Sequence, residues 1–263
     1  MKLFSPRPAA LSNFGRFAAV SGLFVAARYL TILPVPGRHA TGLVGLGRAA
    51  AWFPVVGLAL GVVLLVADQW IVRLFPGLLG ALLTVTLWKV LTGGLHLDGL
   101  ADCLDGLAGR DPNHRRVIMS DSRIGTFGAI GLILFLMIEI VALAELGPGA
   151  RWRALLAAPV IGRAMPPLLA RLYPAARADG QGAAFVAEVT GVAAVAALLI
   201  GLVVAAVTLR AAGLTATLVA VVVAVLGTRF LVGRLGGITG DVLGAAVEAA
   251  ELAALLTVTA STR

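Results

Sequence analysis

Apolar runs and short polar segments alternate along the whole chain. Runs of about 20 apolar residues are long enough to cross a bilayer as helices. The expected spans are residues 52–72, 78–96, 124–146, 154–172, 184–208, 214–232 and 241–260. Glycine and proline occur inside several of these runs, which membrane helices tolerate. The pattern therefore predicts an all-α, polytopic integral membrane bundle of about seven transmembrane helices.

The first 48 residues are interpreted differently because basic residues and prolines interrupt their apolar stretches. Arg28 ends the apolar run 17–27, and no small-residue cleavage site follows, which disfavours a signal peptide. We expect residues 1–48 to form an N-terminal interfacial segment, whose amphipathic or re-entrant stretch ends at Leu33-Pro34-Val35-Pro36. The chain 1–263 is then a single integral-membrane domain.

Composition agrees with a membrane location and narrows the class of partner. Hydrophobic residues make up 60% of the 263 residues and charged residues 13%, whereas a soluble domain carries roughly 25% charged residues. The net charge is +8, but no basic run is interleaved with aromatics, so nucleic acid is not an expected partner. Anionic lipid head groups or a phosphorylated substrate suit this charge better. Cys103, the single cysteine, excludes an internal disulfide.

The distribution of Lys and Arg predicts the orientation. If residues 97–123 are cytoplasmic, fourteen basic residues lie on that side and five on the other. This positive-inside bias predicts a multi-pass protein of the bacterial cytoplasmic (inner) membrane, with residues 97–123 facing the cytoplasm. Four spans separate that segment from the second polar stretch, 233–251. An even number of crossings returns the chain to the same side of the membrane. Both stretches should therefore lie on that side, where they can meet.

Acidic residues cluster in residues 97–123. Asp98, Asp102 and Asp105 are spaced i, i+4 and i+7, so a helix would place all three on one face. Such carboxylates repel one another unless a cation lies between them, and Mg²⁺ or Mn²⁺ prefers their oxygens. Asp241 and Glu248 in the second stretch repeat the seven-residue spacing. All five are candidate metal ligands, because ionisable groups at membrane depth are usually functional.

Arginine and glycine near these acids indicate a phosphorylated ligand. Arg123 follows Asp121 where a span begins, and a guanidinium fork matches phosphate oxygens. Glycine permits close backbone approach to a ligand. The candidate phosphate-binding residues are therefore Arg123, Gly94, Gly99 and Gly125, and further candidates are His96, Arg110, Ser122 and Thr239. Metal-binding acids beside phosphate-binding groups at a membrane face favour phosphoryl transfer.

Several motifs resemble one known family. GGLHLDGLADCLDGL, IMSDSRIGTFG and GGITGDVLGAAVE occur in this order, preceded by YLTILPVP and FPVVGLALG. They resemble the adenosylcobinamide-GDP ribazoletransferases, also called cobalamin-5′-phosphate synthases. The resemblance implies a magnesium-dependent membrane enzyme of late cobalamin synthesis. It would join adenosylcobinamide-GDP to α-ribazole or α-ribazole 5′-phosphate and release GMP.

The resemblance also assigns roles to residues. It implies metal-binding or catalytic roles for Asp98, Asp102, Asp105 and Asp121, with Asp241 and Glu248 in the same site. One carboxylate would act as general base. Leu97, Val117 and Ser120 stand where relatives are expected to carry two acids and a basic residue, so no role is carried over to these three positions. A homo-oligomer is compatible with the sequence.

Two other functions are alternatives for a chain with this acidic stretch. A CDP-alcohol phosphotransferase making phospholipid would carry Ala-Arg after the first Asp-Gly, but here Asp102 follows Ala101. A cation transporter would place acids near the bilayer midplane and show a repeat of hydropathy. In this sequence the acids cluster at the expected helix ends on one face.

Overall fold

The computed structural model describes residues 21–35 and 45–262, which are almost entirely helical. Residues 21–30 are helical, and an isolated parallel bridge pairs Ala175 with Ile238. The elements are η1 (Ala50–Trp52), α2 (Phe53–Leu74), α3 (Gly77–Leu91), α4 (Leu95–Gly106), α5 (Pro112–Met119), α6 (Thr126–Glu145), α7 (Pro148–Leu172), α8 (Gln181–Glu188), α9 (Gly191–Leu209), α10 (Ala211–Leu235) and α11 (Gly240–Ser261).

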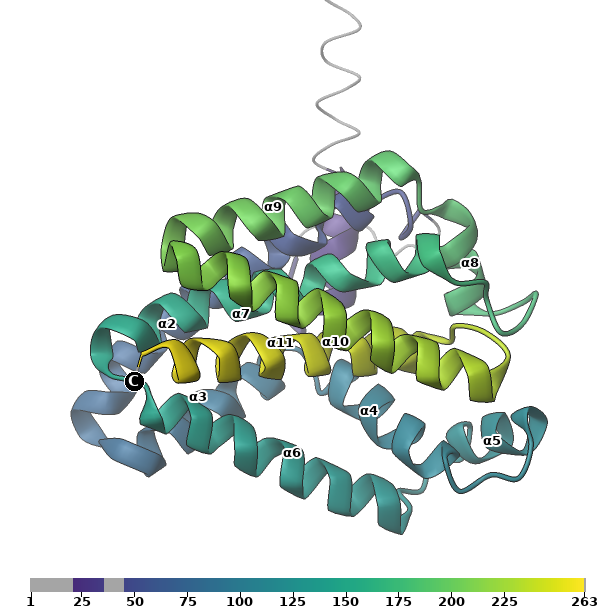
Figure 1. Ribbon diagram of the computed structural model, residues 1–263, viewed down its shortest axis with the longest axis horizontal. Coiled ribbons are helices and arrows are strands. Elements are labelled where there is room, and N and C mark those ends of the chain that lie inside the picture. Colours follow the sequence, from purple (N-terminus) through teal and green to yellow (C-terminus); the bar gives the residue numbers. More distant parts are fainter. Residues whose placement is uncertain (1–20, 36–44, 263) are drawn as a thin grey trace, which may run out of the picture.

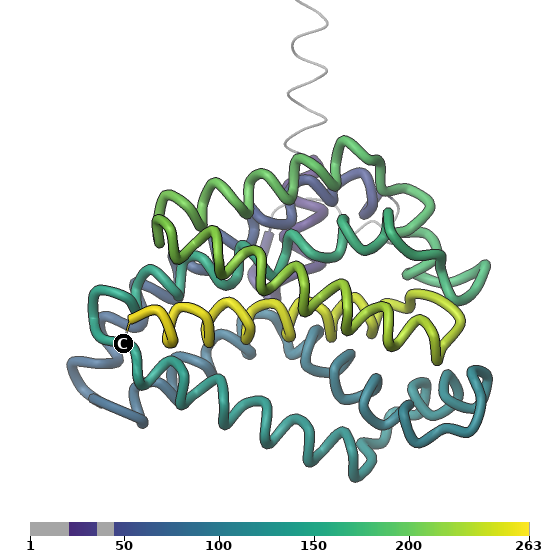
Figure 2. Tube along the Cα trace, in the orientation of Figure 1, coloured from purple at the N-terminus to yellow at the C-terminus, as the bar shows by residue number. Residues whose placement is uncertain are grey.

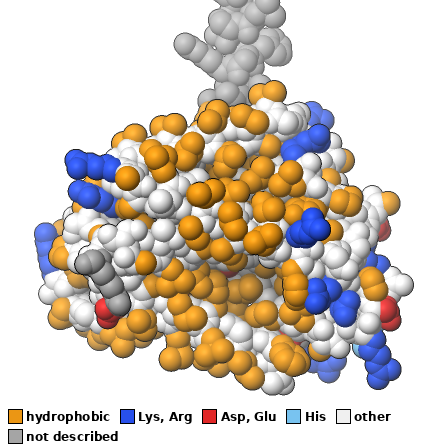
Figure 3. Space-filling model, in the orientation of Figure 1, with side chains coloured by type: hydrophobic (Ala, Val, Ile, Leu, Met, Phe, Trp, Pro, Cys, Tyr) orange, Lys and Arg blue, Asp and Glu red, His pale blue; other side chains and the backbone are white. Residues whose placement is uncertain are grey.

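The long helices run side by side as a bundle, and α7 and α11 form its centre (Figures 1 and 2). Most residues of α7 and α11 are buried, whereas α6, α9 and α10 expose rows of large apolar side chains. Figure 3 shows this apolar surface between basic side chains gathered toward the two ends. Among the described residues, six helices are long and apolar enough to cross a membrane. The protein is therefore a multi-pass helical membrane bundle.

One expected span, 78–96, is not a continuous helix, because the chain turns inside it. α3 ends at Leu91, and α4 leaves it at 91°. Gly93 and Gly94 have φ values of 63° and 69°, a left-handed conformation that glycine adopts without steric cost. The pair α3–α4 is thus a broken span or a re-entrant loop, and its turn carries the glycines that begin the acidic stretch.

Two other expected boundaries also differ. The span 184–208 is divided, because α8 ends at Glu188 and the Thr190 side chain caps a new helix, α9, by accepting the Ala193 N–H. α7 starts at Pro148, earlier than the expected residue 154, because Arg151 is buried inside the bundle against Asp68 of α2.

The described part of the N-terminal segment belongs to the bundle. Ala26 and Leu30 are buried, and the Ile32 N–H donates to the Leu91 carbonyl at the end of α3. The remainder of the expected interfacial segment, 1–20 and 36–44, lies outside the described residues.

The polar connections gather at one end of the bundle. α4, α5, α8 and the start of α11 lie at the right in Figure 1, whereas the α2–α3, α6–α7 and α9–α10 connections lie at the left. The predicted meeting of the two charged stretches is confirmed, because α4 packs against the start of α11.

Candidate active site at the α4–α11 contact

A glycine allows the two acidic helices to touch. A Cβ added to Gly99 would lie 2.7 Å from the Asp241 carbonyl oxygen, so the close contact requires a residue without a side chain. This contact brings residues 143 positions apart in sequence into one site, because Asp98 and Asp241 line the same hollow. Gly99 therefore serves helix packing.

Asp98, Asp102 and Asp241 form the acidic centre of this site. Asp98 is exposed, Asp102 and Asp241 are partly buried, and Asp102 lies within electrostatic range of both others. Asp241 also accepts a hydrogen bond at 3.2 Å from the hydroxyl of Thr239, which caps α11. Three carboxylates in mutual repulsion are an unfavourable arrangement until a cation joins them.

The acidic centre fits a hydrated divalent cation. In the described part of the chain, the only three acidic, histidine or cysteine side chains whose ligand atoms approach within 4.8 Å of one another are Glu139, Glu248 and Glu251. Asp98, Asp102 and Asp241 are therefore spaced too widely to enclose a bare ion. Mg²⁺ keeps several waters and binds through one or two carboxylates plus substrate phosphates, which matches such an open arrangement.

Asp105 differs from the other two acids of α4. It is 8% exposed, and its carboxylate accepts the Gly125 N–H at 2.7 Å and the Gly128 N–H at 2.8 Å. It thus caps the N-terminus of α6, where a negative charge is favourable. A Cβ added to Gly125 would lie 2.4 Å from an Asp105 oxygen, so this glycine makes room for the cap.

We expect Asp105→Asn to lower stability more than it lowers catalysis in the folded protein. Asparagine keeps one acceptor oxygen and leaves a buried N–H of α6 unsatisfied, at a cost of about 1–3 kcal/mol. Thermal unfolding in detergent should show a lower midpoint, with near-normal turnover in the fraction that remains folded. An unchanged midpoint with turnover lost would place Asp105 in the chemistry.

The acidic cleft is an open hollow of about 750 Å³ between α4 and the loop 119–124. Asp98, Asp102, Gly94 and Arg123 line it, together with Asp121 and Ser122. The Arg123 side chain is 86% exposed and pairs with Asp121, Nη2 to Oδ2, at 2.7 Å. The Arg123 guanidinium lowers the pKa of the Asp121 carboxyl to about 2. An ionised pair therefore stands at the cleft wall, and its guanidinium is accessible to an incoming anion.

The other arginines of the acidic stretch have different surroundings. Arg115 donates to the Arg234 carbonyl and Arg116 to the Leu235 carbonyl, so both cap the C-terminus of α10. Arg110 is exposed between α4 and α5 and lines no described hollow; its backbone N–H donates to His114 Nδ1. Through their hydrogen bonds to the last carbonyls of α10, Arg115 and Arg116 attach α5 to α10.

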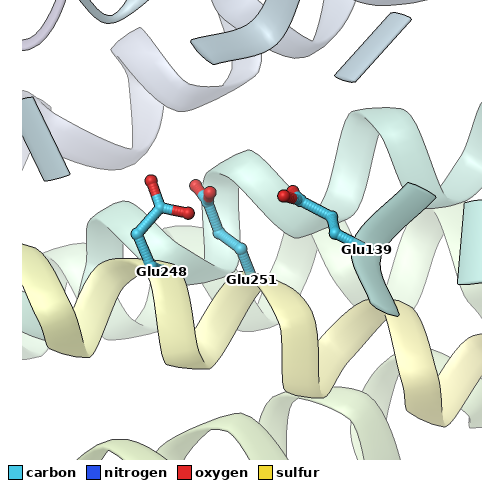
Figure 4. A group of neighbouring side chains, drawn as sticks. All are labelled: Glu139, Glu248 and Glu251. Carbon is cyan, nitrogen blue, oxygen red and sulfur yellow. The ribbon is translucent and has the colours of Figure 1, made fainter. Parts of the chain in front are cut away.

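Glu248 lies two turns deeper than Asp241, in a separate cluster of buried charges. Lys89 Nζ of α3 lies 2.7 Å from Glu248, 2.9 Å from Glu139 of α6 and 3.7 Å from Glu251. Figure 4 shows these three glutamates pointing toward one region between α6 and α11. Arg163 of α7 pairs with Glu251. An ammonium group thus occupies the place between the glutamates.

Sequence reasoning missed this cluster as a unit. Lys89 and Arg163 were noticeable as basic residues inside apolar runs, which is the signal of a functional or structural charge in a membrane protein. Their partners could not be named without the packing of α3, α6, α7 and α11. His96 is buried, and its Nδ1 has no hydrogen-bond partner. It lines a hollow shared with Asp98 and Asp241 and lies within electrostatic range of Lys89 and Arg163.

Comparison with known proteins finds a family whose profile matches most of the chain. The profile of the family described as cobalamin-5-phosphate synthase matches residues 22–259. Relatives named adenosylcobinamide-GDP ribazoletransferase include that of Geotalea daltonii, 34% identical over 90% of this chain and 96% of its own. The relative from Synechococcus elongatus is 40% identical over 86% of this chain and 91% of its own. The relative from Ectopseudomonas mendocina is 38% identical over 88% of this chain and 96% of its own.

No solved structure matched the chain significantly. The family match covers the acidic stretch, the α4–α11 contact and every long helix of the bundle. The chain belongs to the cobalamin-5-phosphate synthase family.

Proposed function

We propose that this protein is an adenosylcobinamide-GDP ribazoletransferase that joins adenosylcobinamide-GDP to α-ribazole or α-ribazole 5′-phosphate. The family match and the names of the relatives support the substrates. The observation that carries the proposal is the meeting of Asp98 and Asp102 with Asp241 beside a cleft lined by Arg123. Phosphoryl transfer needs this combination of cation-binding oxygens and phosphate-binding groups.

The reaction exchanges the phosphoanhydride bond of the donor's diphosphate for a new phosphate ester bond. The 3′-hydroxyl of the ribazole attacks the phosphorus on the cobinamide side of the diphosphate, the bridging P–O bond breaks, and GMP leaves. A carboxylate of the acidic centre accepts the hydroxyl proton. Mg²⁺, or Mn²⁺ in its place, would be held by Asp98, Asp102 and Asp241 and would neutralise the charge that builds up on the phosphates.

The proposed location is the bacterial cytoplasmic membrane with the acidic cleft open to the cytoplasm. The basic excess on the side of residues 97–123 supports this orientation. Cytoplasmic access would also let the water-soluble acceptor enter the cleft and the product GMP leave it. Whether two copies associate is a separate property that the site does not require.

The direct test is release of GMP by the purified protein in detergent. We expect GMP only when adenosylcobinamide-GDP, a ribazole acceptor and Mg²⁺ or Mn²⁺ are all present. Incorporation of CDP-diacylglycerol into phospholipid, with no GMP from adenosylcobinamide-GDP, would instead support a phospholipid synthase. Magnesium-independent GMP release would contradict the proposed role of the acids.

Arg123→Lys should weaken donor binding more than Arg115→Lys. Lysine keeps the charge but loses the fork that matches phosphate, so we expect the KM for adenosylcobinamide-GDP to rise about ten-fold at position 123. Arg115 contacts a backbone carbonyl of α10, and lysine can still donate there, so its KM should change less than about two-fold. Equal, mild effects at both positions would remove Arg123 from the donor site.

A further inference from the structure

Two more hollows adjoin the acidic centre and share a wall. The aromatic pocket, about 110 Å³, is lined by Tyr29, Phe53 and Phe185. The basic cleft, about 260 Å³, is lined by Arg116 and Arg177. Gln181, Gly182, Gly240 and Asp241 line both hollows, so the start of α8 and the start of α11 form a ridge between them.

The aromatic pocket suits a flat apolar ring. The Tyr29 and Phe53 rings stack with centroids 6.4 Å apart, and Phe53 and Phe185 at 5.6 Å. Leu243 and Val247 of α11 add to the apolar part of the lining. The polar part, which includes Asp98 and Asp241, belongs to the acidic centre. Aromatic ligands bind well against such surfaces through apolar burial and offset stacking.

The basic cleft suits a phosphate group. Arg116 is fixed in place because it donates to the Leu235 carbonyl and to Asn113 Oδ1. Arg177 lines the same hollow and lies within electrostatic range of Asp241. Guanidinium groups bind phosphate oxygens in a planar fork. Asp179 also lines the cleft, and its charge opposes that of the arginines.

The ridge is narrow enough for one small molecule to reach both hollows. A Cβ added to Gly182 would lie 3.0 Å from the Gly240 nitrogen, so α8 and α11 approach closely there. A ribonucleotide has an aromatic base and a 5′-phosphate at opposite ends of one sugar. It therefore needs an apolar and a basic subsite on either side of a short wall, and this ridge provides them.

Resting on the function proposed above, we propose that the acceptor nucleotide binds across the Gln181–Gly182 ridge. Its base fills the aromatic pocket, its ribose lies beside Asp241, and its 5′-phosphate contacts Arg177. The acidic cleft on the other side of Asp98 and Ser120 then remains for the diphosphate of the donor. The two substrates would thus approach the acidic centre from opposite sides.

Two acceptors that differ by one phosphate test this assignment. In Arg177→Gln, the KM for α-ribazole 5′-phosphate should rise about ten-fold or more, since a charge-assisted hydrogen bond is lost. The KM for unphosphorylated α-ribazole and for adenosylcobinamide-GDP should stay within about two-fold of wild type. Arg171→Gln is the matched control, because Arg171 is exposed at the end of α7 and lines neither hollow. It should change none of the three constants.

A second variant tests the base subsite. Tyr29→Leu removes a ring from the aromatic pocket and should raise the KM for both acceptors by the same factor. If Arg177→Gln changes the KM of both acceptors equally, or of neither, the phosphate assignment is overturned. If Tyr29→Leu leaves the KM of both acceptors unchanged, the base assignment is overturned. If the wild-type protein releases no GMP with either acceptor, the proposed function itself has failed.

Discussion

Asp102→Asn is expected to abolish GMP release while leaving the protein folded in the membrane. Asp102 lies within electrostatic range of Asp98 and Asp241 and lines the acidic cleft. Loss of a metal-binding carboxylate in phosphoryl transfer should lower kcat/KM by roughly three orders of magnitude or more. The same change removes repulsion among three carboxylates, so the unfolding midpoint without metal should stay the same or rise.

Asp111→Asn is the matched control for Asp102→Asn. Asp111 belongs to the same acidic stretch but is exposed, caps α5 through the Asn113 and His114 N–H groups, and lines none of the described hollows. Asparagine keeps this cap, so activity should remain near that of wild type. Near-normal GMP release by Asp102→Asn would remove this residue from the chemistry.

Lys89→Met is expected to be the most destabilising single change in the bundle. Lys89 is 7% exposed, and it neutralises glutamates from two other helices. Removing one partner of a buried ion pair costs about 3–5 kcal/mol, because the remaining charges lose their compensation. The yield of folded protein and its unfolding midpoint in detergent should both fall sharply.

Glu139→Gln distinguishes a charge effect from a packing effect in this cluster. The change leaves Lys89 and Arg163 facing Glu248 and Glu251, two charges of each sign, so the loss of stability should be much smaller than in Lys89→Met. If Lys89→Met unfolds at the same temperature as wild type, the cluster does not contribute to the stability of the bundle.

The sequence was sufficient for the parts of this fold that depend on hydropathy. Apolar runs predict the long helices, and the even number of spans between the two charged stretches places both at the same end of the bundle. Helical spacing predicts that the α4 acids share one face. The break at Gly93–Gly94 could not be predicted in this way. The apolar run continues through it, and hydropathy averaged over many residues does not reveal a turn of two residues. The division at Thr190 was missed for the same reason.

The individual surroundings of the acids depend on long-range packing that spacing cannot show. Asp102 and Asp105 are neighbours on α4, but only Asp105 meets the start of α6 and becomes its cap. Asp241 and Glu248 are seven residues apart, about two turns or roughly 10 Å along α11. Lys89 reaches the deeper of the two from α3, so one helix face contributes to two separate clusters.

Binding of Mn²⁺ measured by electron paramagnetic resonance shows whether Asp102 and Asp241 hold the divalent cation. Mn²⁺ replaces Mg²⁺ at oxygen ligands and its bound and free forms can be counted in detergent. We expect adenosylcobinamide-GDP to increase bound Mn²⁺ in the wild type and in Glu139→Gln, and Asp241→Asn and Asp102→Asn to lose this binding. Binding that survives in both aspartate variants but disappears in Glu139→Gln would place the cation among the buried glutamates, not at the acidic centre.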